Sequence, residues 1–218
     1  MHKLPHCLAG ALAFALSLPD HALAITILNF GQNSSANTVT ALNDGASPNA
    51  VTTIAATDVA ITIAGNNLGL SVGTQAYLTF AVASTGSLSV LSSGDLAQPF
   101  GGTFSIRSAV AGGGTNFLSG AFSDSVFGDG ASLTLQASEP WDSVSFTSDI
   151  PGAPIAGPRG VSWSFTNLIP LASQANNSLA SFSASIAGNF TGTVPEPGTL
   201  GCLAALSTAG LAGRWRRR

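Results

Sequence analysis

Apolar and small polar residues alternate along the second half of the chain, which is the period-two pattern of strands that bury one face. Residues 161–166, with the sequence Val-Ser-Trp-Ser-Phe-Thr, show this alternation most clearly, and it recurs from Phe182 to Phe190. Three shorter segments with the same pattern are 104–107, 133–135 and 144–147. We therefore expect each segment to place one row of side chains in a core and the other row in solvent.

Further strand candidates lie earlier in the chain, between clusters of Gly, Asn, Asp and Ser, which favour turns. They are residues 25–30, 51–63, 76–83 and 88–91. No stretch between Ile25 and Val194 repeats apolar residues at spacings of three and four, so we expect few helices there. About ten short strands separated by turns predict an all-β fold, an antiparallel β-sandwich of the jelly-roll or Greek-key type.

A β-solenoid is the structural alternative, because Gly, Ser, Thr and Asn are abundant in the chain. A solenoid needs an internal repeat of constant period. The glycine-rich segments 112–114 and 127–130 do not recur at a constant interval, so the sequence favours the sandwich.

The first 24 residues have the features of a secretory signal peptide. Lys3 precedes an apolar stretch from Cys7 to Leu18, and the small residues Ala22 and Ala24 fit the site at which signal peptidase cuts. The apolar stretch is shorter than a membrane-spanning helix needs. We therefore expect a signal helix that directs the chain to the secretion machinery and is removed after Ala24.

The C-terminal segment has three parts: Pro195-Glu196-Pro197, an uncharged run from Gly198 to Gly213, and a basic end. As a helix the run would be about 24 Å long, against a hydrocarbon core of about 30 Å, so we expect a short transmembrane helix. The basic end consists of Arg214, Arg216, Arg217 and Arg218, with Trp215 among them. These arginines should stay in the cytoplasm, because a charge at the bilayer centre costs about 2.5 to 3.5 kcal/mol.

Small residues recur every four positions within the apolar run. They are Gly201, Ala205, Ala209 and Gly213. One face of the expected helix is therefore smooth enough for another helix to approach closely, as in docking against a membrane enzyme. Chance spacing in an alanine-rich helix is the alternative explanation.

The segment between Ile25 and Val194 is acidic, with eight acids, two bases and a net charge of −6. The acids are Asp44, Asp58, Asp95, Asp124, Asp129, Glu139, Asp142 and Asp149, and the bases are Arg107 and Arg159. A segment without a basic patch is unsuited to nucleic acid, so we expect no nucleic-acid partner.

The same segment has no His, Cys, Lys or Met. This composition excludes a Ser-His-Asp triad, a Cys-His pair, a lysine Schiff base and a zinc site with His or Cys ligands, and we expect no metal and no cofactor. Carboxylate chemistry is left, and Glu139 and Asp142, on either side of Trp141, are the pair that could act on a glycosidic bond. Acids in such a connecting turn are ordinarily just solvated.

Two other acids, Asp124 and Asp129, offer oxygen ligands for calcium. They lack the alternating acidic spacing of an EF-hand loop, so we interpret them as ordinary loop acids.

Three aromatic residues, Tyr77, Trp141 and Trp163, are candidates for a sugar-binding platform. Trp163 lies on the apolar side of its strand pattern and is expected in the core, which leaves Trp141 as the better candidate.

The expected solvent faces carry mostly Ser, Thr and Asn, so charge does little to block association between copies of the chain. Glycosylation of hydroxyl groups and deliberate self-association are the two hypotheses for such a surface.

The tail formed by Val194-Pro195-Glu196-Pro197, the apolar run and the arginine cluster resembles the PEP-CTERM sorting domain, also catalogued as an ice-binding-protein C-terminal domain. The resemblance implies export by the general secretory route and anchoring in the inner membrane with the body in the periplasm. It further implies recognition at Pro195, Glu196 and Pro197 and cleavage by an exosortase, a membrane enzyme resembling cysteine transpeptidases. Proteins with such tails occur in Gram-negative bacteria that make exopolysaccharide and biofilm. The alternative family name does not predict ice binding, because the threonines show no regular period.

These features divide the chain into a signal peptide (1–24), a β-rich exported domain (25–193) and a sorting and anchor segment (194–218). A looser resemblance between residues 117–149 and a body type of such proteins implies no activity. We expect a non-enzymatic protein of the cell surface or extracellular matrix, with extracellular polysaccharide as a candidate partner. A carbohydrate-binding module acting through Trp141 is the first alternative, and a carboxylate-dependent glycoside hydrolase is the second.

Overall fold

A computed structural model describes residues 25–193 except 152 and 154. This part of the chain is all-β and antiparallel, as expected, and contains no helix, hence none able to cross a membrane. The strands are β1 (Ile25–Gln32), β2 (Val39–Asn43), β3 (Thr52–Asn66), β4 (Gln75–Ser84), β5 (Ser89–Val90), β6 (Leu96–Arg107), β7 (Asn116–Gly128), β8 (Leu133–Ser138), β9 (Ser143–Thr147), β10 (Ala156–Ile169), β11 (Gln174–Ala175), β12 (Ser178–Leu179) and β13 (Phe182–Thr193). The expected signal helix and transmembrane helix lie outside the described residues.

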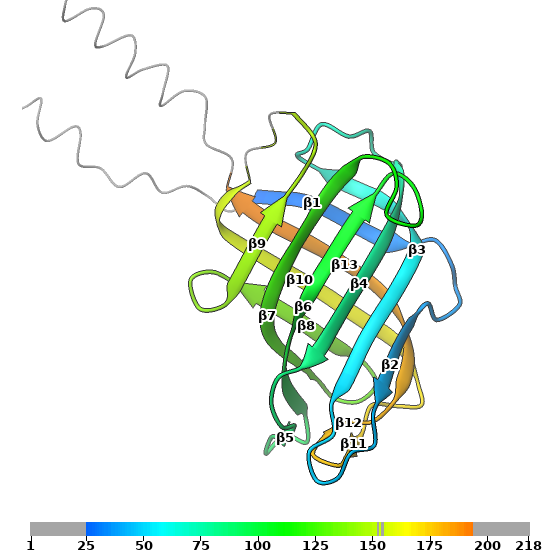
Figure 1. Ribbon diagram of the computed structural model, residues 1–218, viewed down its shortest axis with the longest axis vertical. Helices are drawn as coiled ribbons and strands as arrows, with labels where there is room; N and C mark the ends of the chain where they lie inside the picture. The colour runs from blue at the N-terminus through cyan, green and yellow to red at the C-terminus, as the bar shows by residue number, and fades with distance from the viewer. Residues whose placement is uncertain (1–24, 152, 154, 194–218) are drawn as a thin grey trace, which may run out of the picture.

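The main sheet closes on itself. Its strands follow the order β6-β4-β3-β1-β13-β10-β8-β7, and β7 pairs back with β6. Strands that are neighbours in this ring also follow one another along the chain, apart from the β1–β13 pair that closes the ring. The prediction of jelly-roll or Greek-key connections between the strands is therefore wrong. The two packed layers of a sandwich are present, but they belong to one continuous sheet, and the strands of one layer cross those of the other (Figure 1).

Two positions in the ring are filled by interrupted strands. β1 and β2 both lie between β3 and β13 and run in the same direction, separated by residues 33–38. In the same way, β8 and β9 pair with successive parts of β7, separated by residues 139–142. The first interruption leaves the ring closed, whereas β9 pairs with β7 but not with β10, so a gap separates β9 from the first part of β10.

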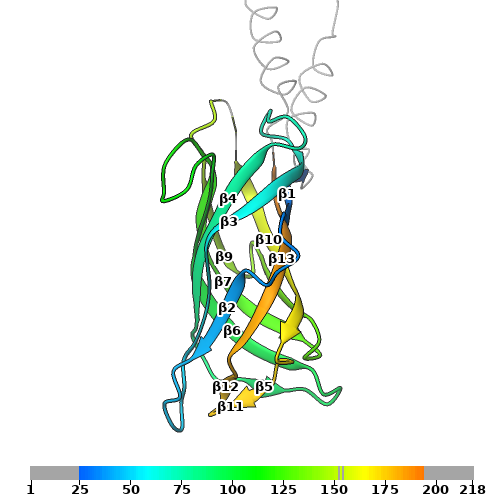
Figure 2. The same ribbon diagram turned by 90° about the vertical axis from the view of Figure 1, so that its right-hand side faces the viewer.

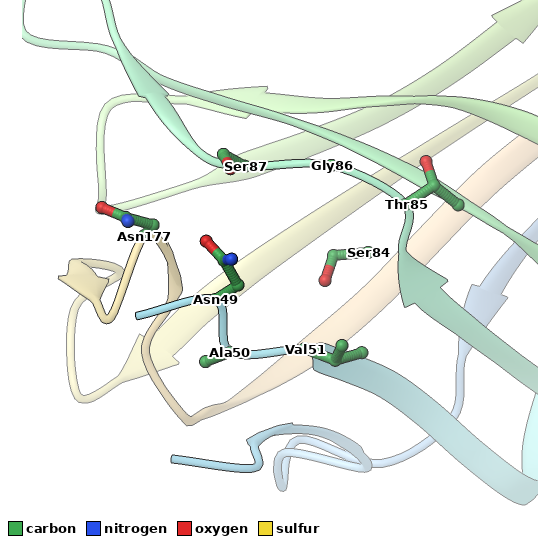
Figure 3. A pocket seen from close by; sticks show the side chains of 8 residues that line it. All are labelled: Asn49, Ala50, Val51, Ser84, Thr85, Gly86, Ser87 and Asn177. Atoms are coloured by element: carbon green, nitrogen blue, oxygen red, sulfur yellow. The ribbon is translucent and has the colours of Figure 1, made fainter. Parts of the chain in front are cut away.

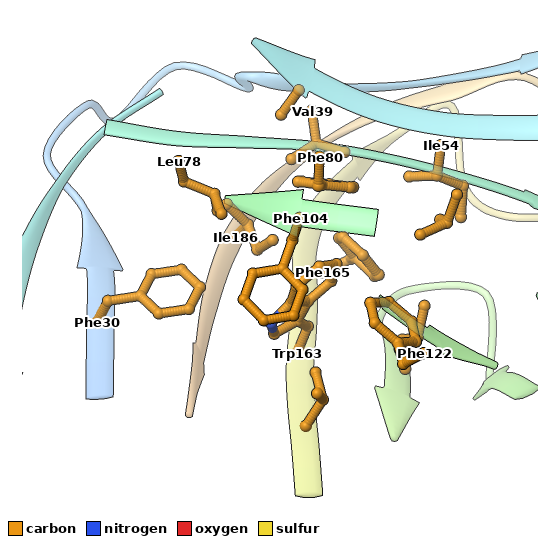
Figure 4. Packing of buried hydrophobic residues seen from close by; sticks show 14 of the residues in the cluster. Phe30, Val39, Ile54, Leu78, Phe80, Phe104, Phe122, Trp163, Phe165 and Ile186 are labelled. Carbon is orange, nitrogen blue, oxygen red and sulfur yellow. The ribbon is translucent and has the colours of Figure 1, made fainter. Parts of the chain in front are cut away.

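Trp163 of β10 is fully buried at the centre of the core, which confirms the expectation from the alternation around it. Its ring lies 4.8 Å from that of Phe80 and 5.1 Å from that of Phe122, measured between centroids. Phe104 and Phe190 lie 5.8 and 6.2 Å away. Because Phe80, Phe104 and Phe122 come from β4, β6 and β7, the indole joins the two layers (Figure 4).

The middle of the outward side of the layer formed by β4, β6, β7 and β9 carries three rows of small uncharged side chains in register. One row across these strands is Thr79, Ser105, Ser119 and Thr147, the next is Ala81, Thr103, Ala121 and Ser145, and the third is Ala83, Gly101, Ser123 and Ser143. None of these positions is buried, so the structure exposes three neutral rows on this layer. Charged groups border the first row: Arg107 lies opposite Tyr77, and Asp58 Oδ1 accepts a hydrogen bond from Thr79 Oγ1 at 3.2 Å.

Candidate functional site

Both ends of the described chain lie at the same end of the closed sheet (Figure 2). Ile25, the first described residue, pairs with Gly192 of β13. Thr193, the last residue of β13, is 2% exposed, and its Oγ1 donates a hydrogen bond to the carbonyl oxygen of Gly157 at 2.7 Å. The Pro-Glu-Pro sequence therefore begins two residues after a firmly held strand.

The targeting residues singled out from the sequence lie outside the described part of the chain. At the N-terminal end these are Ala22 and Ala24. At the C-terminal end they are Pro195, Glu196, Pro197, Gly201, Ala205, Ala209, Gly213, Arg214, Arg216, Arg217 and Arg218. The structure describes the residues that adjoin these segments, Ile25 on one side and Thr193 on the other.

Trp141 projects from the turn between β8 and β9 and is 89% exposed. The turn is closed at its base by Asp142, whose Oδ2 accepts a hydrogen bond from the backbone N–H of Ser138 at 2.8 Å. The backbone N–H of Asp142 in turn donates to the carbonyl oxygen of Ser138 at 3.0 Å. A large aromatic side chain is thus presented to solvent on a turn with fixed geometry.

Glu139, at the start of the same turn, forms an ion pair with Arg159 of β10, with 3.1 Å between Oε1 and Nη1. The second carboxylate oxygen accepts the backbone N–H of Arg159 at 2.8 Å. The guanidinium also donates to the carbonyl oxygens of Val144 and Ile155, at 3.5 and 3.3 Å. Arg159 therefore bridges the gap between β9, which pairs with β7, and the first part of β10.

These contacts give both carboxylates considered for glycosidic chemistry a structural role. The oxygens of Glu139 hold Arg159, and the carboxylate of Asp142 holds Ser138. The pairing of Glu139 with a residue twenty positions away could not be found from sequence spacing, because it depends on how β8 and β10 align.

The three aromatic residues considered for a sugar platform do not come together. Trp163 is in the core, and Tyr77 lies on β4 opposite Arg107. Trp141 lies in the turn just before β9. β6 and β7 lie between β4 and β9, so the strands of Tyr77 and Trp141 are three strand spacings of about 4.8 Å apart. Any aromatic contact with a sugar would therefore depend on Trp141 and not on Tyr77 or Trp163.

The acids considered for calcium occupy different elements. Asp129 lies in the turn after β7, where its Oδ1 accepts from the backbone N–H groups of Ala131 and Ser132 at 3.1 and 3.2 Å. Asp124 lies within β7, opposite Phe100 of β6. Within residues 25–193, as far as they are described, no group of three or more His, Cys, Asp or Glu side chains is arranged to hold a metal ion.

A polar cluster that sequence reasoning missed closes the far end of the sheet, the end opposite the two chain termini. Gln98, 1% exposed, donates from Nε2 to Ser178 Oγ at 2.8 Å and to the Gly86 carbonyl oxygen at 2.9 Å. Its Oε1 accepts the backbone N–H of Leu179 at 2.9 Å. The β11–β12 hairpin is thereby fastened across the opening, with the positive φ angles of its turn supplied by Asn176 and Asn177.

A shallow pocket of about 190 Å³ lies beside this hairpin (Figure 3). It is lined by Asn49, Ala50, Val51, Ser84, Thr85, Gly86, Ser87 and Asn177. All of these side chains are uncharged, so the pocket offers hydrogen bonds to a neutral group but no acid, base or strong nucleophile.

A comparison with known protein families matches residues 193–218 to the PEP-CTERM protein-sorting motif. The match covers Pro195, Glu196 and Pro197, the apolar run and the terminal arginines, and it confirms the resemblance found in the sequence. A tail of this kind belongs to an exported, membrane-associated protein that is targeted to an exosortase. No curated protein and no solved structure matches the chain.

Proposed function

We propose that the PEP-CTERM tail delivers a non-enzymatic protein to the cell surface or extracellular matrix, where it is linked to exopolysaccharide or biofilm. The family match at residues 193–218 is the observation that carries this proposal. The lack of His, Cys and Lys between Ile25 and Val194 supports a role without catalysis, as do the bracing contacts made by Glu139 and Asp142. Signal peptidase acts first in this proposal, the inner membrane then holds the chain with its body in the periplasm, and the exosortase releases or transfers it.

The surface of the body is suited to a matrix role. Closing the sheet removes most of the free strand edges through which β proteins aggregate. The neutral rows on β4, β6, β7 and β9 carry no charge that would repel a second copy or a neutral polymer. Association in the matrix would therefore use faces of the sheet instead of strand-to-strand pairing.

Deletion of Arg214–Arg218 is expected to release the chain from the membrane fraction. Without the basic end, nothing prevents the short apolar run from being drawn across the bilayer. Cell fractionation followed by immunodetection of the body measures this change. As a matched control, Glu196→Gln alters the sorting motif but keeps the basic end, so that unprocessed chain should accumulate in the membrane. Equal secretion of the full chain and the truncated chain would contradict the anchoring role of the arginines.

Carbohydrate binding through Trp141 is a second candidate function, favoured by the 89% exposure of this side chain on a braced turn. Exposed aromatic rings stack well on sugar rings because they bury apolar area and keep a polar edge in water. Addition of the producing cell's own polysaccharide is then expected to change the tryptophan emission of the chain. Trp141→Ala should abolish that change, whereas the buried Trp163 should not respond. Unchanged emission of the unaltered chain across that polymer would exclude this function.

A further inference from the structure

Two loops form part of the end of the molecule that carries the chain termini. We call them the terminal rim: residues 67–74, between β3 and β4, and residues 108–115, between β6 and β7. Asn66, just before the first loop, pairs with Leu28 of β1, and Arg107, just before the second, pairs with Tyr77 of β4. Both loops therefore lie at the end that carries the chain termini, the first beside the strand at which the described chain begins and the second further round the sheet, beyond β3 and β4 (Figure 2).

The tether between this end and the membrane segment is short. Gly198, where the apolar run begins, follows Thr193 by five residues, which span at most about 18 Å when fully extended. Pro195 and Pro197 fix two of the intervening φ angles and limit how far the tether can fold back. The body must consequently stay close to the bilayer, with its terminus-bearing end nearest.

The terminal rim presents apolar side chains to solvent. Val72 is 76% exposed and Val110 is 50% exposed. Neither loop contains a charged residue. An exposed apolar group next to a bilayer gains free energy by entering the boundary between headgroups and acyl chains.

Charge is distributed in the direction that favours this orientation. Loops at the far end carry Asp44, Asp95 and Asp129 with no cation, whereas the half that bears the termini holds both cations of the described residues, Arg107 and Arg159, together with the acids Asp58, Glu139, Asp142 and Asp149. In that half Glu139 is paired with Arg159, Asp58 accepts the backbone N–H of Ala111 in the second loop at 2.9 Å, and Asp149 accepts the backbone N–H of Asn116 at 3.0 Å. A membrane with anionic lipids would therefore repel the far end more than the terminal rim.

We infer that the terminal rim docks on the phospholipid bilayer that holds the sorting tail, with Val72 and Val110 entering the headgroup region. This inference rests on the proposed anchoring of the tail and adds an orientation to it. The body then stands upright on the membrane while it is anchored, with the far-end polar pocket pointing away from the lipid.

Site-specific fluorescence in vesicles tests this orientation. In the full mature chain, Cys202 is replaced by serine and a single cysteine is introduced as Val72→Cys, Val110→Cys or Val90→Cys. Val90 is the matched control, since it is a valine with 56% exposure at the far end. Each cysteine is labelled with the environment-sensitive dye NBD, and the protein is reconstituted in vesicles of phosphatidylethanolamine and phosphatidylglycerol.

We expect labels at positions 72 and 110 to show blue-shifted emission and a several-fold rise in intensity, and the label at position 90 to keep the emission of a water-exposed dye.

A fourth sample, labelled at the native Cys202, reports insertion of the tail. Lipid-like emission from Cys202 together with water-like emission from positions 72 and 110 would overturn the rim contact and leave the anchor intact. Water-like emission from Cys202 itself would overturn both. Because the vesicles contain no other protein, a rim that contacts only a membrane enzyme would give the first of these negative results.

Discussion

Replacement of Trp163 by alanine is expected to lower the free energy of unfolding by about 3 to 5 kcal/mol, the range found when a large aromatic side chain is removed from a packed core. The indole is fully buried and contacts rings from both layers of the closed sheet. Its N–H finds no hydrogen-bond acceptor among the described residues, so the loss comes from packing and from the cavity left behind. Urea unfolding followed by far-ultraviolet circular dichroism measures the change.

The matched control is the same substitution at Trp141. That side chain is 89% exposed, and surface substitutions of this kind usually change stability by less than about 0.5 kcal/mol. A Trp163→Ala protein that unfolds at the same urea concentration as Trp141→Ala would contradict the central position of Trp163.

The second large effect is expected from Gly102→Ala in β6. A Cβ atom at this position would lie 2.6 Å from the Cα atom of Val82 and would also overlap the carbonyl oxygen of Ala81, both of which belong to the backbone of β4. Backbone atoms cannot rotate out of the way as a side chain can, so β4 and β6 would have to separate locally. Overpacking of this kind costs about 1 to 3 kcal/mol, which thermal or urea unfolding resolves.

Gly101, the next residue in the same strand, supplies the control. A Cβ atom there would meet the Thr85 Cγ2 atom at 3.5 Å, an ordinary van der Waals contact, and the residue lies on the outward side of the sheet. Gly101→Ala should be neutral or should stabilise the protein by about 0.4 to 1 kcal/mol, because alanine restricts the unfolded chain. Equal destabilisation by the two substitutions would show that the close approach of β4 and β6 is wrong.

Several strands could be predicted from alternation, and their true extents show where that signal fails. Residues 161–166 and 182–190 fall within β10 and β13, because their inward side chains are large and their outward ones small. The segment 104–107 is only the last third of β6. Its earlier part contains Gln98, Pro99, Gly101 and Gly102, which look like turn residues although Gln98 is buried and bonded across the far end.

The closure of the sheet could not be predicted from the pattern. Alternation of apolar and polar residues shows that one face of a strand is buried. The same alternation results whether the strand pairs with its neighbour in sequence or with a distant strand, so the pattern does not reveal the pairing. The pairing that completes the ring joins Ile25 to Gly192, the two extremes of the described chain. We expected Greek-key connections by analogy with other all-β domains, and the actual connections are simpler.

The candidate sites differ in how much the sequence revealed. The sorting tail could be identified from its residues alone, because Pro-Glu-Pro, an apolar run and terminal arginines form a signal that is read in linear order. The bridge from Glu139 to Arg159 and the cluster around Gln98 depend on contacts between residues far apart in the chain, and neither has a local motif.

The β1–β13 pair also sets the order of events during export. A chain that crosses a membrane with its N-terminus first delivers β1 at the start and β13 at the end. The sheet can therefore close only after nearly the whole domain has emerged, and until then β1 has no partner on that side. The apolar run follows β13 by only a few residues, so if it halts translocation as proposed, that step coincides with the arrival of the strand that completes the fold. We therefore expect the body to finish folding at the membrane surface, while the proposed anchor still holds the chain there.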